Sequence, residues 1–258
     1  MKSLEDSSID SRPETTSRPI DGPLNNAIFI HAAILDKCID RLIQYLDVIY
    51  DCGLFENISH LFICFVGDGT IPIDSILLSK YKNNEKIIIN RVSNNLEDYE
   101  LPTLNLLYHF CKKNLNYNVL YLHTKNVGKE INLCIEDQIE YMLHFNVKKW
   151  KMCIDKLLMH KTCGVDLRRD PTLHYSGNFW WSNASYIATL PEPCEFNNLQ
   201  KYPNPLNSLR HNQEFWICYH KESDYHYSLW DCGINCYERH LHRYPKTYYL
   251  VNNAVLDT

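Results

Sequence analysis

The sequence lacks the features that mark several classes of protein. Its 258 residues include 26 lysines and arginines against 31 aspartates and glutamates, and no basic block of the kind that neutralises a phosphate backbone. Nucleic acid is therefore not an expected partner. No run approaches the roughly 20 apolar residues of a membrane span. The first 24 residues are rich in serine, proline and acidic side chains, without the apolar stretch of a signal peptide, which predicts a solvated tail.

A glycine-rich phosphate loop is also missing. The stretch VGDGT at 66–70 is too short for that motif, which weighs against a nucleotidyltransferase. The 11 cysteines are an odd number scattered through apolar segments such as HLFICFVG. This pattern indicates buried free thiols in a reducing compartment, and we expect a cytoplasmic protein.

From residue 27 onward, short β-rich runs alternate with longer amphipathic stretches. Strands are expected at 27–35, 60–68, 85–93 and 118–125, and helices at 36–53, 73–82 and 101–114. Helical connections of this kind imply right-handed crossovers and a mostly parallel sheet with helices on both faces. The predicted fold class is α/β, with a single domain over residues 25–258.

Polar residues follow the predicted strands, where ligands of parallel sheets bind. The candidates for binding a ligand at these ends, with one at the start of the helix at 101–114, are His31, Gly67, Asp68, Thr103, His123, Thr124 and Lys125. A polar strand end followed by a turn is the simpler interpretation of the His-Thr-Lys run, and it stays open.

The second half of the chain begins with one long helix or a kinked pair of helices at 134–161 and continues into the aromatic stretch HYSGNFWW. Flat apolar rings beside hydrogen-bonding groups suit a sugar, which presents a C–H face and a rim of hydroxyls. The candidates for sugar or acceptor binding are His174, Tyr175, Ser176, Gly177, Asn178, Trp180 and Trp181. The alternative is a corner of the hydrophobic core.

Four segments in this order and spacing resemble glycosyltransferases of viral, algal and bacterial polysaccharide clusters: ELPTLNLLYHFCKK, NVLYLHTKNVG, CGVDLRRDPTLHYSGNFWWSNASYIATLP and QEFWI. The His-Thr-Lys strand is similar to one in rhamnan-synthesis-type proteins. The resemblance implies a GT-A-like (Rossmann-like) fold with a nucleotide-sugar half at 25–128 and an acceptor half at 129–258. It implies transfer of a sugar, UDP-linked by expectation, to a glycan or small acceptor. The alternative function is a non-catalytic carbohydrate-binding protein on the same fold. If the source is viral, the expected location is the host cytoplasm. A homodimer is possible on this sequence and stays open.

The sequence departs from the pattern of these enzymes after the fourth predicted strand. GT-A enzymes usually carry an Asp-X-Asp motif after the fourth strand, whose carboxylates hold a divalent metal against the diphosphate. This chain has His123, Thr124 and Lys125 there. Either Lys125 neutralises the diphosphate directly, which we favour, or Mn²⁺ or Mg²⁺ is held by carboxylates such as Asp166 and Asp170.

The expected general base is Glu214, in a predicted helix at 211–220 capped by Asn212, because a carboxylate beside bulky apolar groups can have its pKa raised. Asp166 competes for this role. The two arginines at 168–169 are equally suited to bind phosphate or to be solvated. A zinc site at Cys232, Cys236, His240 and His242 is disfavoured, because the spacing fits none of the common patterns.

The tail offers a first prediction. Deleting residues 1–24 should change the melting temperature by less than a few degrees, because the segment has too little apolar surface to offset the entropy of ordering it. Thermal unfolding of the truncated and full chains measures this, and a loss of several degrees would reveal an ordered element in the tail.

Overall fold

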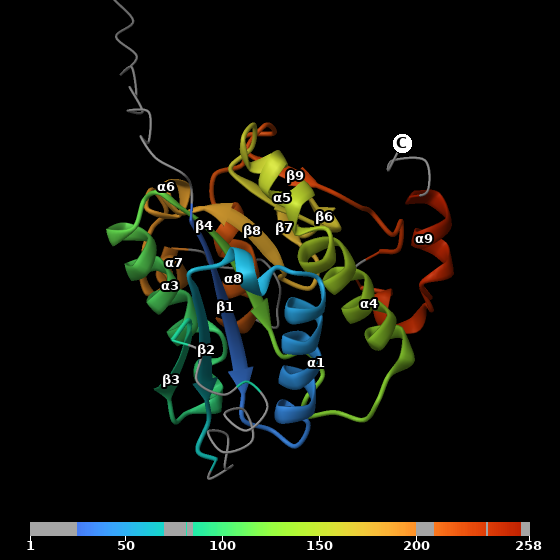
Figure 1. The fold of residues 1–258 in the computed structure, drawn as a ribbon, viewed down its shortest axis with the longest axis horizontal. Helices are drawn as coiled ribbons and strands as arrows, with labels where there is room; N and C mark the ends of the chain where they lie inside the picture. The colour runs from blue at the N-terminus through green and yellow to red at the C-terminus, as the bar shows by residue number, and fades with distance from the viewer. Residues whose placement is uncertain (1–24, 70–80, 82–84, 200–208, 236, 254–258) are drawn as a thin grey trace, which may run out of the picture.

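The computed structural model describes residues 25–69, 81, 85–199, 209–235 and 237–253. At its centre lies a seven-stranded sheet in the order β3-β2-β1-β4-β8-β5-β9 (Figure 1). The strands are β1 (Asn25–Ala33), β2 (His60–Val66), β3 (Ile87–Ser93), β4 (Tyr117–His123), β5 (Thr162–Gly164), β8 (Trp180–Asn183) and β9 (His226–Ser228). Strand β8 is antiparallel to both neighbours, and the other pairings in the sheet are parallel. A separate ladder joins β6 (Leu167–Arg168) to β7 (His174–Tyr175).

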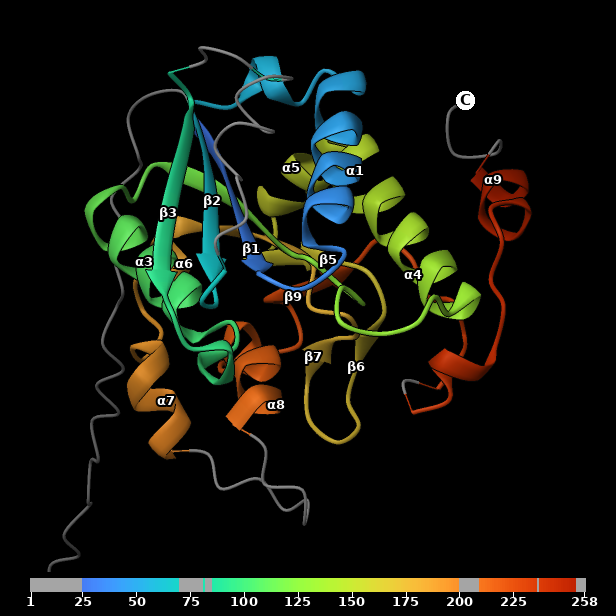
Figure 2. The same ribbon diagram turned by 90° about the horizontal axis from the view of Figure 1, so that it is seen from below.

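Helices cover both faces of this sheet, as the two views show (Figures 1 and 2). One face packs on α1 (Cys38–Asp51), α4 (Leu133–Leu143) and α5 (Trp150–Leu157), and the other on α3 (Leu101–Lys113), α6 (Ala184–Ile187) and the 3-10 turn η4 (Trp216–Cys218). The remaining helical elements are η1 (Phe55–Asn57), η2 (Leu96–Asp98), η3 (His144–Lys148), α7 (Pro193–Leu199), α8 (Leu209–Phe215), η5 (Arg239–Leu241) and α9 (Thr247–Asn253). Along β1, Ile28 and Ile30 enter the first core while Ala27 and Phe29 enter the second, which is why this strand reads as one apolar run.

The predicted α/β class, a mostly parallel sheet flanked by helices, is confirmed. The segment at 134–161 is a kinked pair, in which the π-helical turn η3 separates α4 from α5. Asn212 lies inside α8, so the prediction that it caps a helix is wrong. The predicted helix at 73–82 and the tail at 1–24 lie outside the described residues, and the division into two functional halves stays a prediction.

Membrane-spanning helices were searched for within the described residues. None of the helices there combines the length and the apolar character needed to cross a bilayer.

The adjacent tryptophans of β8 are core residues. Trp180 stacks on Tyr121 with ring centroids 5.0 Å apart, and Trp181 enters the opposite core. Both indoles are fully buried because β8 is paired on both edges and covered on both faces. The Trp181 Nε1 donates to the carbonyl of Asn146 at 2.7 Å, within the π-helical turn, where the helical hydrogen-bond pattern is interrupted.

The bond to the π-helical turn predicts the effect of Trp181→Phe. The variant should lower the free energy of unfolding by about 1–3 kcal/mol, because it leaves the Asn146 carbonyl without its donor and opens a small cavity. Chemical denaturation measures the loss. Sugar binding should be unchanged in the folded variant, and a selective loss of binding with full stability would return Trp181 to the binding site.

Candidate functional site

A cavity of about 240 Å³ opens beyond the carboxyl end of β4. It is bounded by residues from the β4 end, α4, the β6–β7 hairpin and the turn after it, α8 and the C-terminal segment. They are Lys125, Ile135, Gln138, Pro171, His174, Ser176, Gly177, His211, Glu214, Phe215, Tyr237, Arg239 and His240. Five of the candidates predicted from the sequence therefore meet in one place: Lys125, His174, Ser176, Gly177 and Glu214.

The ends of β1 and β4 form the floor beneath this cavity. His31 and His123 are partners in the parallel register of the two strands. Thr124 locks the strand ends together, since its backbone N–H donates to the His31 carbonyl at 2.8 Å and its hydroxyl accepts from the Ala33 N–H at 3.1 Å. Thr103 lies under the same corner, with its hydroxyl 3.0 Å from the His31 Nδ1. Three of these nucleotide-binding candidates, His31, Thr103 and Thr124, thus hold the floor in place and do not line the cavity.

Both histidines of the floor are buried and neutral. Burial lowers the pKa of His31 to about 4 and that of His123 to about 3, and the nearby Lys125 ammonium adds to the effect on His123. The His123 Nε2 lies 2.9 Å from the Gly177 carbonyl, which can only accept a hydrogen bond, so Nε2 carries the proton. His123 is therefore a fixed donor that holds one wall of the cavity.

That wall is a turn in a conformation few residues adopt. Gly177 has φ +96°, and a Cβ there would lie 2.5 Å from the Met142 sulfur. Asn178 follows with φ 56°, held by its side chain, which accepts from the Trp180 indole at 2.8 Å and donates to Glu100 at 2.7 Å. The turn is thus fixed from both ends by buried hydrogen bonds.

Glu100 is the buried carboxylate to which this turn is tied. Besides Asn178, it accepts from the Tyr121 hydroxyl at 2.5 Å, and its Oε1 lies 3.8 Å from the His123 Nδ1. Its backbone N–H donates to the Gln213 side chain at 2.7 Å. Because Glu214 is the next residue in α8, this last bond also fixes the helix that carries the expected base.

Lys125 and Glu214 bring opposite charges into the cavity. Burial lowers the pKa of the Lys125 ammonium, while the Glu214 carboxylate acts in the opposite direction. His174 stands between the β6–β7 hairpin and α8, with its Nδ1 on the Thr172 carbonyl at 2.8 Å and its ring edge-on to Phe215. Burial lowers the pKa of His174 as well, so it enters the cavity as a neutral imidazole. The cavity can therefore hold an anion beside Lys125 and accept a proton at Glu214.

Asp166 lies outside the lining of this cavity. Its carboxylate is buried and accepts from the Tyr141 hydroxyl, from the Cys232 backbone N–H at 2.8 Å and from Arg168 at 3.1 Å. Like Asn178, it has a positive φ, of 50°. Because these donors come from α4, from the segment of Cys232 and from β6, the Asp166 carboxylate holds the three segments together.

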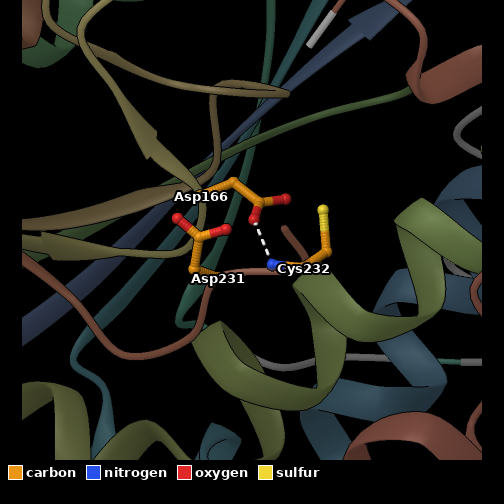
Figure 3. A group of neighbouring side chains, drawn as sticks. All are labelled: Asp166, Asp231 and Cys232. Atoms are coloured by element: carbon orange, nitrogen blue, oxygen red, sulfur yellow. Dashed lines mark hydrogen bonds between the residues drawn. The ribbon is translucent and has the colours of Figure 1, made fainter. Parts of the chain in front are cut away.

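Asp166 also belongs to a cluster that could be taken for a metal centre, together with Asp231 and Cys232 (Figure 3). Arg168 bridges the two carboxylates, at 3.1 Å from Asp166 and 2.5 Å from Asp231. The Arg168 guanidinium thus already pairs with the carboxylates that a divalent cation would need as ligands. The Asp166 oxygens also accept hydrogen bonds from Tyr141 and from the Cys232 backbone. These residues do not fit a divalent metal.

The remaining candidates do not line the cavity. Gly67, with φ +122°, and the exposed Asp68 follow β2, and Tyr175 is in the core with its hydroxyl 2.8 Å from that of Thr162. The arginine pair at 168–169 and Asp170 border a second cavity of about 340 Å³ on the β6–β7 hairpin. Glu100, Gln138 and Arg239 were missed by the sequence analysis, because no spacing links them to the motifs and the C-terminal segment has no readable period.

Comparison with known proteins gives a family. Residues 50–228 match the family described as "Domain of unknown function (DUF8361)". No curated protein matches the sequence. Among solved structures, the chain is similar to a protein of Desulfovibrio desulfuricans G20 provisionally named a nucleotide-diphospho-sugar transferase, with 8% identity, a TM-score of 0.43, and coverage of 90% of this chain and 96% of that one.

The neutral histidines of the floor predict how stability depends on pH. In the unfolded chain they take up protons below their ordinary pKa of 6.5, whereas in the native state they stay neutral down to about 4 and 3. The free energy of unfolding should therefore fall between pH 7 and pH 5, by at most about 2 kcal/mol per histidine. Denaturation at the two pH values measures the difference. His123→Gln, which keeps a donor for Gly177, should show a smaller difference, and equal stability at both pH values would contradict the burial argument.

Proposed function

The chain belongs to the DUF8361 family, and we propose that it is a glycosyltransferase that moves a sugar from a nucleotide-sugar donor to a hydroxyl of an acceptor. One observation carries the proposal: Lys125, His174, Ser176 and Glu214, from three separate segments, line one cavity beyond the carboxyl end of a parallel strand. An ammonium, neutral hydrogen-bonding groups and a carboxylate are what the transfer of a polyhydroxylated group from a diphosphate requires.

In the proposed reaction Glu214 is the general base. Its carboxylate takes the proton of the acceptor hydroxyl as the oxygen of that hydroxyl forms a bond to the anomeric carbon of the donor. The bond from the anomeric carbon to the phosphate oxygen breaks, and the nucleoside diphosphate leaves with the electron pair. The bond between Gln213 and the Glu100 backbone fixes α8, which supports a precise position for the neighbouring Glu214.

Lys125 neutralises the charge that grows on the leaving diphosphate. Its side chain has no hydrogen-bond acceptor among the described residues, so its donors are available to a ligand. Burial makes an ammonium more effective, because the surroundings screen its field less than water does. The carboxylate cluster around Asp166 does not fit a divalent metal, and the proposed reaction uses none.

The sugar is bound by neutral groups of the same cavity. His174 and Ser176 supply hydrogen bonds, and the close turn at Gly177 lets the ligand approach the backbone. Asn178 and Trp180 hold the turn in shape from behind the cavity wall, whereas Tyr175 and Trp181 are core residues. His31, Thr103, His123 and Thr124 have the same supporting role toward the nucleotide side, and we retain the exposed Asp68 with Gly67 as contacts for the nucleoside.

The finer features of the proposal rest on the sequence. We take the enzyme to be of the viral, algal or bacterial polysaccharide-cluster type, related to rhamnan-synthesis-type proteins. We take its donor to be UDP-linked and its acceptor to be a glycan or a small molecule. The ten cysteines that the structure describes are free thiols, in keeping with a reducing, cytoplasmic location. A carbohydrate-binding protein without catalysis is the competing function, and turnover decides between the two.

The experiment combines a screen of nucleotide-sugars with two variants that should fail differently. Glu214→Gln should lower kcat for transfer or slow hydrolysis by roughly 10²-fold or more with little change in nucleotide affinity, because it keeps the size and removes the base. Lys125→Ala should lower both affinity and kcat, and Lys125→Arg should restore affinity only in part.

Three outcomes would contradict the proposal. Binding of sugars without turnover would favour the carbohydrate-binding alternative. Loss of activity with a chelator, restored by Mn²⁺ or Mg²⁺, would show that the reaction depends on a divalent metal and would contradict the metal-free reaction proposed here. A strong effect of Asp166→Asn on kcat with none of Glu214→Gln would move the base to Asp166.

A further inference from the structure

Arg239 is the most deeply buried cation of the cavity. It lies in η5, beyond the residues that match the family, and its side chain is 3% exposed although it lines the cavity. Its Nη1 donates to the His242 carbonyl at 2.7 Å and its Nε lies 3.3 Å from the Tyr141 hydroxyl. Its Nη2 is buried and has no hydrogen-bond partner among the described residues.

A buried guanidinium N–H without an acceptor is costly, and native proteins keep few such groups, each of which needs an explanation such as a functional role or a bound water or ion. The rings of Tyr141 and Tyr244 lie within 5.2 Å and 5.8 Å of the guanidinium carbon, which further restricts the side chain. Among the described residues, Arg239 forms no ion pair with a carboxylate. The cavity therefore contains a preoriented cation whose charge is not balanced by an ion pair.

We propose that Arg239 binds an anionic oxygen of the ligand, of the phosphoryl or carboxylate class, in the same cavity as Lys125. This inference rests on the proposed function, which it deepens by assigning a second anion-binding residue from the C-terminal segment. Two cations that approach an anion from different elements fix its orientation, whereas Lys125 alone supplies a point charge.

The same bonds give Asp166 and Tyr141 a role as positioning residues. Arg239 donates to the Tyr141 hydroxyl, and Tyr141 donates to Asp166, which is anchored by Arg168 and the Cys232 backbone. The chain of hydrogen bonds runs from the cavity to the β6–β7 hairpin and holds the guanidinium at a fixed angle. Asp166 thus acts on the cavity through Tyr141, from a place where its own carboxylate does not line it.

The test measures binding of inorganic pyrophosphate by calorimetry in the presence of a chelator. Arg239→Lys keeps the charge and loses the planar fork, and it should weaken binding by about tenfold or more. The matched control is Arg243→Lys in the same segment, whose side chain is half exposed and paired with Asp137, and it should bind as the wild type does. Wild-type affinity in Arg239→Lys, or a wild type that binds neither pyrophosphate, UDP nor glucuronate, would overturn the proposal.

A double-mutant cycle tests the positioning chain. Tyr141→Phe should weaken pyrophosphate binding several-fold in the wild-type background and should have no further effect once Arg239 is lysine. Equal effects of Tyr141→Phe in both backgrounds would show that Tyr141 acts on binding independently of Arg239, which would overturn the positioning role. The unfolding of each variant is measured beside binding, so that a loss of stability is recognised.

Two further arms identify the source of the anion. Competition between UDP and pyrophosphate assigns the site to the donor, whereas loss of glucuronate binding in Arg239→Lys with normal UDP affinity assigns it to an acidic acceptor. Either supports the anion site. Failure of all nucleotide-sugars in the turnover screen, with pyrophosphate binding still dependent on Arg239, would reject the transferase and leave the anion site standing.

Discussion

The buried carboxylate of Glu100 is the group on which the shape of the cavity depends. It begins α3 and accepts hydrogen bonds from Tyr121 in β4 and from Asn178 in the cavity wall, while its backbone holds Gln213 of α8. A buried charge left without these donors would cost several kcal/mol, so the three elements are held to one arrangement. The wall and the helix of Glu214 are therefore tied to each other as one unit.

Charge is distributed unevenly around this unit. The histidines of the cavity floor are kept neutral by burial, whereas Lys125 and Arg239, among the described residues, bring cationic side chains to the lining of the cavity. These two cations arrive from segments more than a hundred residues apart, and Glu214 supplies the opposing carboxylate. Neutral hydrogen-bonding groups between charges of opposite sign can bind an anion and remove a proton in the same small space.

The first half of the fold was predictable because its strands are long enough to show a pattern. β1, β2, β3 and β4 have seven to nine residues each, and the alternation of Ile28 and Phe29 between two cores follows from a parallel sheet. The strands of the second half have two to four residues, too few to show a period.

The candidate site was predictable in part for the same reason. Lys125, His174 and Glu214 follow recognisable segments, whereas Arg239 reaches the cavity through a tertiary contact that leaves no spacing in the sequence. Tryptophans also look alike in a core and in a sugar site, and only the pairing of β8 on both edges places Trp180 and Trp181 inside.

The position of β1 in the sheet has a consequence for the unit that folds. The residues that match the family begin at 50, after β1 has ended, yet β1 pairs with β2 on one edge and β4 on the other. A fragment limited to the matched residues would have a gap in the middle of its sheet and two unpaired edges facing each other. Such edges invite a strand from another chain, so the fragment would be prone to aggregate or to borrow the missing strand from a neighbour.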